Sequence, residues 1–104
     1  MEVIVRDDGL ERFIYSLQKR TIAKVLRTLD LLEMFGNKLG MPHSKKIAPK
    51  LFELRIRGEQ EVRILYTFSD SKAILLTGFV KKSEKIPWRE IERARRKLAL
   101  VDSI

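Results

Sequence analysis

The strongest constraint on the fold comes from residues 51–68, where apolar and polar side chains alternate on both sides of a short polar stretch. The apolar positions are Phe52, Leu54 and Ile56 in the first half and Val62, Ile64, Tyr66 and Phe68 in the second. Alternation with a period of two is typical of a half-buried β-strand. The segment therefore predicts a β-hairpin with one apolar face and one basic face.

The register of this hairpin follows from the requirement that both apolar sets face one core, because a one-residue shift would turn one set outward. A three-residue loop at 58–60 meets the requirement and places Arg55 opposite Arg63, whereas a five-residue loop places Arg57 opposite Arg63. Like charges directly opposite each other destabilise a sheet. An anionic ligand would explain the pair. A solvated basic face with splayed side chains is the alternative.

The composition indicates a folded, basic chain. It has 104 residues, of which 44% are hydrophobic and 35% charged, which is enough for one domain spanning residues 1–104. Cysteine is absent, which excludes disulfides and thiolate chemistry. There is neither an apolar run of about 20 residues nor a signal peptide, so we expect a cytoplasmic protein that does not bind membranes.

The positive charge is unevenly placed along the chain. The net charge is +8; residues 1–44 hold 7 Lys/Arg against 6 Asp/Glu, whereas residues 45–104 hold 15 against 8. This asymmetry favours a polyanionic partner such as nucleic acid, or an acidic protein.

The first third of the chain predicts a strand followed by two helices. Residues 1–6 form the strand, and Asp7 or Asp8 caps the first helix. Residues 19–21 are predicted as a polar break before a second amphipathic helix, which Gly36 ends. Residues 36–50 are predicted as a basic loop, because Gly40, Pro42 and Pro49 disfavour regular structure.

After the hairpin, a turn at 69–71 leads into residues 73–80, which are apolar on both faces and should form the most buried strand. Pro87 suits the first turn of a last helix, whose apolar side is Ile91, Ala94, Leu98 and Val101. The order β-α-α-β-β-β-α predicts an α+β fold with a mainly antiparallel sheet. The helical hairpin should pack on one face of the sheet.

Metal or cofactor chemistry is not expected. The chain has one histidine and no carboxylate cluster at ligand spacing, and it has no Gly-rich phosphate loop. His43 lies in a proline-flanked loop without the signature of a catalytic triad.

The remaining chemistry belongs to arginine and lysine. The side chains that could converge on one basic site are Arg55, Arg57, Arg63, Lys45, Lys46, Lys50, Lys81, Lys82 and Lys85. Such a site suits metal-independent RNA cleavage, in which the 2′-hydroxyl attacks the adjacent phosphorus. Arginine can orient the phosphate and stabilise the added charge, and a lysine whose pKa is lowered by neighbouring cations can move the proton.

Two aromatic residues are candidates for stacking on RNA bases. Tyr66 falls on the apolar side of its strand, which favours a core position, whereas Trp88 could either stack on a base or cover the edge of the core. The run Arg93, Arg95, Arg96 and Lys97 indicates a solvated helix face or a docking surface for an acidic partner.

Four segments in order resemble the RelE/HigB superfamily of type II toxins, in particular its phage-derived, HigB-like branch. They are Leu51-x-Glu53-Leu54-Arg55, Arg63-Ile-Leu-Tyr66, Gly78-Phe-Val-Lys-Lys82-x-x-Lys85-x-Pro87 and Glu90-Ile-Glu-x-Ala94. The resemblance implies a RelE-like fold and a ribosome-dependent mRNA endonuclease that cuts in the A site and arrests translation. It also implies a helix-turn-helix, HigA-like antitoxin, through which the complex would bind its operator DNA.

Carried over residue by residue, the resemblance matches Arg55, Arg63 and Lys82 to the family's basic catalytic positions, and Trp88 falls near the position of a catalytic or stacking aromatic. Lys85 completes the set of catalytic candidates. Lys45, Lys46, Lys50, Arg57, Lys81 and Trp88 are the candidates for contact with mRNA and ribosomal RNA. Some members of the superfamily use a late histidine, which this chain lacks, so a lysine is the expected base. The alternatives are a ParE-like gyrase poison of the same fold and a non-catalytic RNA-binding module.

Overall fold

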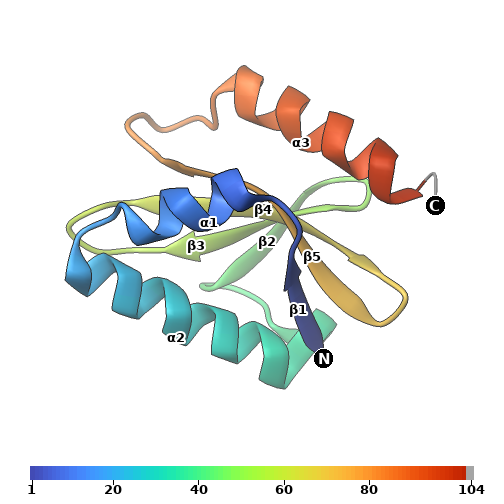
Figure 1. Cartoon of the computed structure of the whole chain (residues 1–104), viewed down its shortest axis with the longest axis horizontal. Helices are drawn as coiled ribbons and strands as arrows, with labels where there is room; N and C mark the ends of the chain where they lie inside the picture. The colour runs from blue at the N-terminus through green and yellow to red at the C-terminus, as the bar shows by residue number, and fades with distance from the viewer. Residues whose placement is uncertain (103–104) are drawn as a thin grey trace.

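A five-stranded sheet of order β1-β5-β4-β3-β2 lies at the centre of the computed structural model, which describes residues 1–102 (Figure 1). The strands are β1 (Glu2–Val5), β2 (Ser44–Ala48), β3 (Leu51–Ile56), β4 (Val62–Ser69) and β5 (Lys72–Val80). Only β1 and β5 run parallel; the other neighbours are antiparallel. The predicted domain 1–104 ends two residues beyond the described part.

Three α-helices pack on this sheet: α1 (Asp8–Tyr15), α2 (Lys19–Phe35) and α3 (Trp88–Asp102). A short 3-10 helix, η1 (Gly36–Lys38), follows α2. The Asp7 carboxylate caps α1 by accepting a 2.7 Å hydrogen bond from the Gly9 amide, as predicted for one of the two aspartates. Gly36 ends α2 with a φ of 55°, a conformation that favours glycine.

The helices cover opposite faces of the sheet. One apolar cluster joins α1 and α2 to β3, β4 and β5, and a second joins α3 to Leu51, Leu65, Ile74, Leu76 and Phe79. In Figure 1, α3 lies above the sheet and the α1–α2 hairpin lies in front of and below it. The predicted α+β class and the order of its elements are confirmed, with one strand added.

Gly78 allows α1 to approach the sheet closely. A Cβ atom at this position would lie 2.8 Å from Leu10 Cδ1 and 3.0 Å from the ring of Phe13. The first distance is shorter than real Cβ contacts and the second is at their lower limit, so a larger residue would displace the Leu10 and Phe13 side chains. Glycine in a strand often marks a close backbone approach of this kind.

The prediction that residues 36–50 form only a loop is wrong, because β2 occupies Ser44–Ala48. No proline lies inside this strand, since Pro42 and Pro49 flank it. Ser44 is buried and donates or accepts a 2.5 Å hydrogen bond with the Tyr66 hydroxyl. β2 is an edge strand, where exposed lysines are typical.

The predicted polar break at 19–21 is also wrong, because α2 already begins at Lys19. The connection is only residues 16–18, and Gln18 is extended at the N-cap position. Thr21 packs inward at 3% exposure, so a polar residue within an amphipathic face was mistaken for a break.

The face of the hairpin predicted to be open is largely covered. Leu65 lies on that face and is fully buried under the cluster that α3 completes. The apolar side of α3 was predicted correctly, but its pattern did not indicate where that helix would pack. The charged part of the face is therefore confined to one end of β3 and β4.

Candidate functional site

Two arginines face each other at the end of the central hairpin. Arg55 of β3 is the direct partner of Arg63 on β4, and Leu54 is the partner of Ile64. The ladder ends at Ile56 and Val62. The register predicted with the shorter loop is thus the observed one, although the strands end one pair earlier than that loop requires, and the pairing of Arg57 with Arg63 does not occur.

Glu53 lies between these two arginines. Its Oε1 is 3.6 Å from Arg55 Nε, and its Oε2 is 3.5 Å from Arg63 Nε. Glu61 is a second carboxylate partner, with Oε1 3.6 Å from Arg63 Nη2. We call Glu53, Arg55, Glu61 and Arg63 the arginine cluster. Its carboxylates offset the repulsion that opposed like charges would otherwise produce.

Burial differs sharply among the three predicted arginines. The side chain of Arg63 is 2% exposed and that of Arg55 is 15% exposed, whereas Arg57 is exposed. Arg63 Nη1 also donates a 3.0 Å hydrogen bond to the Val62 carbonyl. In this structure, therefore, Arg55 is the cluster's arginine that reaches the surface, and Arg63 lies beneath it.

The segment after β5 begins beside the same hairpin end. The Lys81 amide donates a 2.6 Å hydrogen bond to the Glu61 carbonyl, which ties residues 81–87 to the β3–β4 turn. Lys82 and Lys85 are exposed, and Lys81 is half-buried. Figure 1 shows this segment and the turn at the same end of the molecule, away from the N-terminus.

The three lysines predicted from the segment before the hairpin separate in the structure. Lys45 pairs with Glu53 in the β2–β3 register, so it borders the arginine cluster. Lys46 lies over the Phe52 ring at 6.0 Å, on the opposite face of the sheet. Lys50 lies in the β2–β3 turn with a φ of 60°, at the far end of β3 from Arg55.

The aromatic candidates also separate. Tyr66 is 1% exposed and packs between Phe52 and Phe68, which confirms its predicted core position. Burial raises the pKa of its hydroxyl, with the Ser44 hydrogen bond acting in the opposite direction. Trp88 is 72% exposed at the start of α3, so it is not a cover for the core. His43, which follows Pro42 in the segment before β2, is half-buried, and its carbonyl accepts a hydrogen bond from the Arg55 amide.

Sequence reasoning missed the two glutamates of the arginine cluster. Glu53 has the same parity as Arg55, two positions away, so strand alternation already places both on one face. That signal was available. The three-residue loop at 58–60 leaves Glu61 outside the loop, two positions before Arg63, so the same parity applied to this pair.

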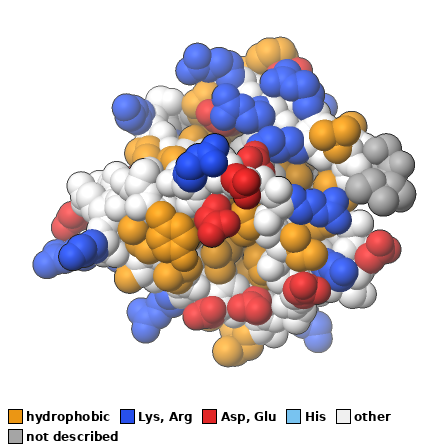
Figure 2. All heavy atoms as spheres, in the orientation of Figure 1, with side chains coloured by type: hydrophobic (Ala, Val, Ile, Leu, Met, Phe, Trp, Pro, Cys, Tyr) orange, Lys and Arg blue, Asp and Glu red, His pale blue; other side chains and the backbone are white. Residues whose placement is uncertain are grey.

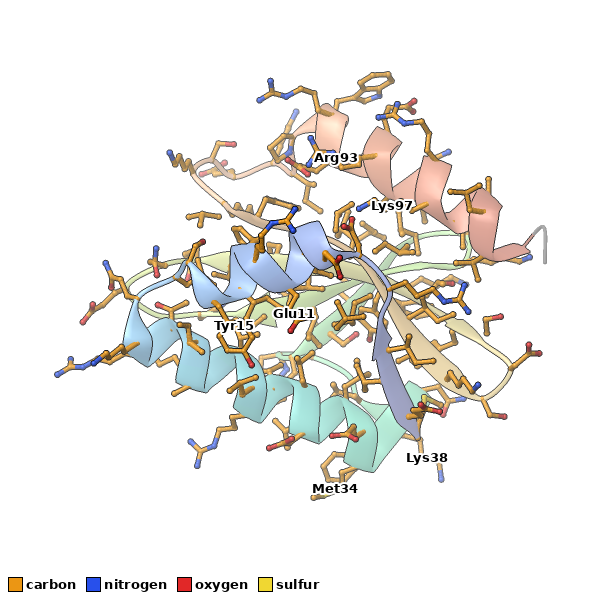
Figure 3. All side chains as sticks on the ribbon, viewed as in Figure 1. Glu11, Tyr15, Met34, Lys38, Arg93 and Lys97 are labelled. Carbon is orange, nitrogen blue, oxygen red and sulfur yellow. The ribbon has the colours of Figure 1, made fainter. Side chains whose placement is uncertain are left out.

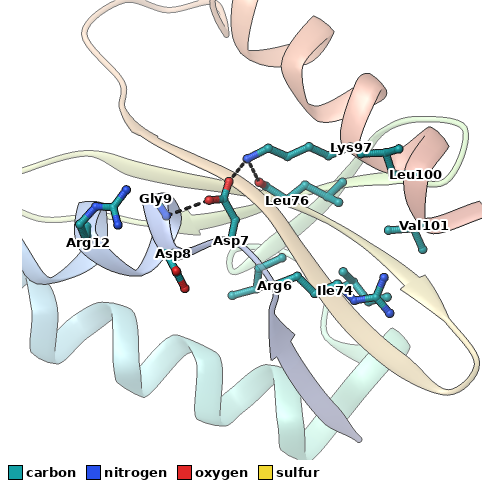
Figure 4. A pocket seen from close by; sticks show the side chains of 11 residues that line it. Arg6, Asp7, Asp8, Gly9, Arg12, Ile74, Leu76, Lys97, Leu100 and Val101 are labelled. Carbon is teal, nitrogen blue, oxygen red and sulfur yellow. Dashed lines mark hydrogen bonds and ion pairs between the residues drawn. The ribbon is translucent and has the colours of Figure 1, made fainter.

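A second group of charges lies beside the middle of β5. Lys97 of α3 forms an ion pair with Asp7 and donates a 3.0 Å hydrogen bond to the Leu76 carbonyl (Figure 4). The Lys97 ammonium lowers the pKa of the Asp7 carboxyl, and the bond from the Gly9 amide acts in the same direction. Figure 3 shows Lys97 and Arg93 on the side of α3 nearest α1.

This Asp7–Lys97 pair borders a pocket of about 480 Å³ between α1, β5 and α3. Its lining combines Ile74, Leu76 and Val101 with Arg6 and Arg12. None of the predicted site residues lines it. Figure 2 shows Lys and Arg side chains gathered over α3 at the top of this face.

No metal site is formed by the described residues: among residues 1–102 there is no group of three or more His, Cys, Asp or Glu side chains that could hold an ion. In the same part of the chain, no helix is both long and apolar enough to span a membrane.

Comparisons with known proteins identify the family. The sequence family described as "Phage derived protein Gp49-like" matches residues 12–99. The chain belongs to this family. It is 37% identical over 84 residues to a candidate toxin, HigB3, of Mycobacterium tuberculosis, covering 76% of this chain and 73% of that one.

The fold also has a solved counterpart. A chain of the YoeB–YefM complex from Staphylococcus aureus superposes with a TM-score of 0.57 at 17% identity, covering 80% of this chain and 97% of the other. At that identity the match concerns the fold alone. The predicted resemblance to the RelE/HigB superfamily is confirmed by these comparisons.

Proposed function

We propose that this chain is the toxin of a type II toxin–antitoxin pair and acts as a ribosome-dependent endoribonuclease. Family membership and the shared fold support the toxin assignment. The observation that carries the nuclease assignment is the pair of arginines held in register on the central sheet, next to the segment that bears Lys81, Lys82 and Lys85.

The proposed reaction needs no metal. The 2′-hydroxyl of the mRNA attacks the adjacent phosphorus and displaces the 5′-oxygen of the next nucleotide, leaving a 2′,3′-cyclic phosphate. Arg55 binds the phosphate and stabilises the charge of the pentacoordinate transition state. Arg63, which is buried beneath Arg55, supports the Arg55 side chain. Lys82 or Lys85 transfers the proton.

Binding would extend beyond the reacting phosphate. Lys45 borders the arginine cluster, and Lys81, Arg57 and the exposed Trp88 lie on elements at or adjoining the same end of the sheet. These side chains offer phosphate contacts and one stacking surface. Lys46 lies on β2 and Lys50 in the β2–β3 turn, away from the arginine cluster, so we assign them to contact with ribosomal RNA.

The proposed partner is an antitoxin of the helix-turn-helix, HigA-like kind, and the pair would bind operator DNA through it. The similarity to a chain from a toxin–antitoxin complex supports an antitoxin partner. The proposed site of action is the cytoplasm, where both the ribosome and the antitoxin would be met.

The proposal is tested by mapping mRNA 5′ ends in a translation extract with and without added protein. We expect new ends within codons, appearing only when ribosomes are present. Lys82→Ala should remove them while leaving the protein folded. If the protein binds RNA but leaves the mRNA intact, a non-catalytic binding module is favoured. If expression of the protein causes DNA breaks without mRNA cleavage, a gyrase poison is favoured.

A further inference from the structure

We infer that Glu53 is a positioning residue of the proposed nuclease site. It would hold the Arg55 guanidinium in the orientation that a phosphate needs, without itself touching RNA. This inference rests on the proposed function and adds to it a residue that was not among the predicted site residues.

The contacts of Glu53 are divided between the two arginines. One carboxylate oxygen lies 3.6 Å from Arg55 Nε, and the other lies 3.5 Å from Arg63 Nε. The Glu53 side chain is only 6% exposed, and it is fixed on a strand that has hydrogen-bonded neighbours on both sides. A substrate as large as RNA therefore has little access to this carboxylate.

The geometry leaves the outer end of Arg55 available. Arg55 Nε is buried and forms no hydrogen bond within the described residues, so the Glu53 carboxylate is its ionic partner on the inner side. Within the described residues, Arg55 Nη1 donates a hydrogen bond to a weak acceptor, Met41 Sδ, at 3.6 Å. Glu53 thus orients the base of the guanidinium, and the nitrogens at its end remain free to bind phosphate.

Arg63 explains why Glu53 does not simply cancel the charge of Arg55. A single buried carboxylate beside Arg55 would leave no net charge to attract a phosphate. With Arg63 on its other side, the Glu53 carboxylate is shared between two arginines, and Glu61, which brings the net charge of the whole cluster to zero, is 40% exposed and makes its contact with Arg63. The buried Arg63 therefore keeps the surface arginine electropositive while Glu53 keeps it in place.

The experiment measures single-turnover cleavage of mRNA on programmed ribosomes, with toxin in excess. The rate constant, the amplitude and the toxin concentration for half-maximal rate are recorded separately. For Glu53→Gln we expect the rate constant to fall about 100-fold, as for a catalytic group displaced by about 1 Å. The half-maximal concentration should stay the same or decrease, because the change removes a negative charge.

The readouts separate positioning from a structural role. Loss of folded protein lowers the melting temperature and raises the apparent toxin concentration for half-maximal rate, but it leaves the rate constant at saturating toxin unchanged. If Glu53 were only a countercharge, Glu53→Gln would strengthen RNA binding without slowing cleavage. Either result would overturn the inference.

Two matched variants provide controls for the same chemical change. Glu61→Gln removes a carboxylate that also pairs with Arg63 but is 40% exposed and does not reach Arg55, so we expect a loss of about threefold or less. Glu59→Gln alters an exposed residue paired with Arg20 and should leave the rate constant unchanged. Equal losses for Glu53→Gln and Glu61→Gln would contradict a special role for Glu53.

Glu53→Asp keeps the inference testable if Glu53→Gln does not fold. It retains the charge but withdraws the carboxylate by one methylene, and we expect a rate constant about 10-fold below the wild type. A folded Glu53→Asp with the wild-type rate constant would overturn the inference while the nuclease function stands. A wild-type chain that leaves mRNA intact would instead overturn the function, and this inference with it.

Discussion

The arginine cluster and the Asp7–Lys97 pair are two charged groups that differ in how they depend on the rest of the fold. The cluster lies within one hairpin, and its Glu53 and Arg63 are 6% and 2% exposed. The Asp7–Lys97 pair joins residues 90 positions apart in the sequence, and its side chains are 36% and 30% exposed. The contacts of the cluster are local in sequence and largely buried, whereas the contact of the pair is long-range in sequence and partly exposed to solvent.

The difference in burial determines how much each group can contribute to stability. Buried charges cost free energy to desolvate, and removing one partner leaves the other without compensation. A partly exposed pair gains little and loses little, because water and salt screen it. The cluster therefore suits a rigid site, whereas the pair is a weak connection between α1 and α3.

The largest effect should come from Arg63→Ala. It leaves Glu53 buried and paired on one side only, so we expect a loss of about 3–5 kcal/mol in the free energy of unfolding. Urea denaturation measures this loss. Arg57→Ala removes an exposed arginine two positions from Arg55 and should change stability by about 0.5 kcal/mol or less. A similar small change for Arg63→Ala would show that the cluster is not a buried network.

A smaller effect is expected for Asp7→Ala, which removes both the α1 cap and the ion pair. We expect a loss of about 1–2 kcal/mol, most of it from the cap. Asp7→Asn keeps a capping side chain and should lose less than half as much. Denaturation of both variants under the same conditions separates the two contributions, and equal losses would assign the effect to the ion pair.

The pair should also respond to acid. Because the folded-state pKa of Asp7 is lowered from 3.8, its contribution is fully present above pH 3.8 and is lost as the pH falls through the lowered value. Lys97→Met should therefore destabilise the protein at pH 6 but have a diminishing effect below pH 3.8. The measurement is urea unfolding of both proteins from pH 6 to pH 2.5. An unchanged difference at the lowest pH would contradict the assignment.

A change in salt concentration should have the smallest effect on stability, and it should distinguish the two charged groups most clearly. A double-mutant cycle on Asp7 and Lys97 should give a coupling of about 0.2–1 kcal/mol in dilute buffer and close to zero in 1 M NaCl, where the Debye length is about 3 Å. A cycle on Glu53 and Arg63 should change little with salt, because both side chains are buried. Equal salt dependence of the two cycles would remove the distinction between the regions.

The same contrast explains which features the sequence predicted. Parity narrowed the hairpin register to two options, which place either Arg55 or Arg57 opposite Arg63, and the structure has the first of these. Glu53 shares that parity and could have been included. The Asp7–Lys97 contact could not be predicted, because it depends on where α3 packs, and the periodicity of a helix shows which side is buried but not what covers it.

The strand β2 was missed for a different reason. Its flanking prolines were treated as evidence against regular structure, yet Ser44 sits between them and bonds to Tyr66, 22 residues later. Short edge strands carry a weak pattern of their own, and pairing with β3 stabilises this one. Tertiary context therefore decided this segment.

The parallel pairing of β1 with β5 has a consequence for synthesis. Glu2–Val5 pairs with residues 72–75, so the first strand has no partner until about 70 further residues have been made. The antiparallel hairpins can form earlier from neighbouring residues, because closing short loops costs less entropy. During translation, β1 cannot pair until β5 has been made, so the complete sheet forms only after most of the protein has left the ribosome.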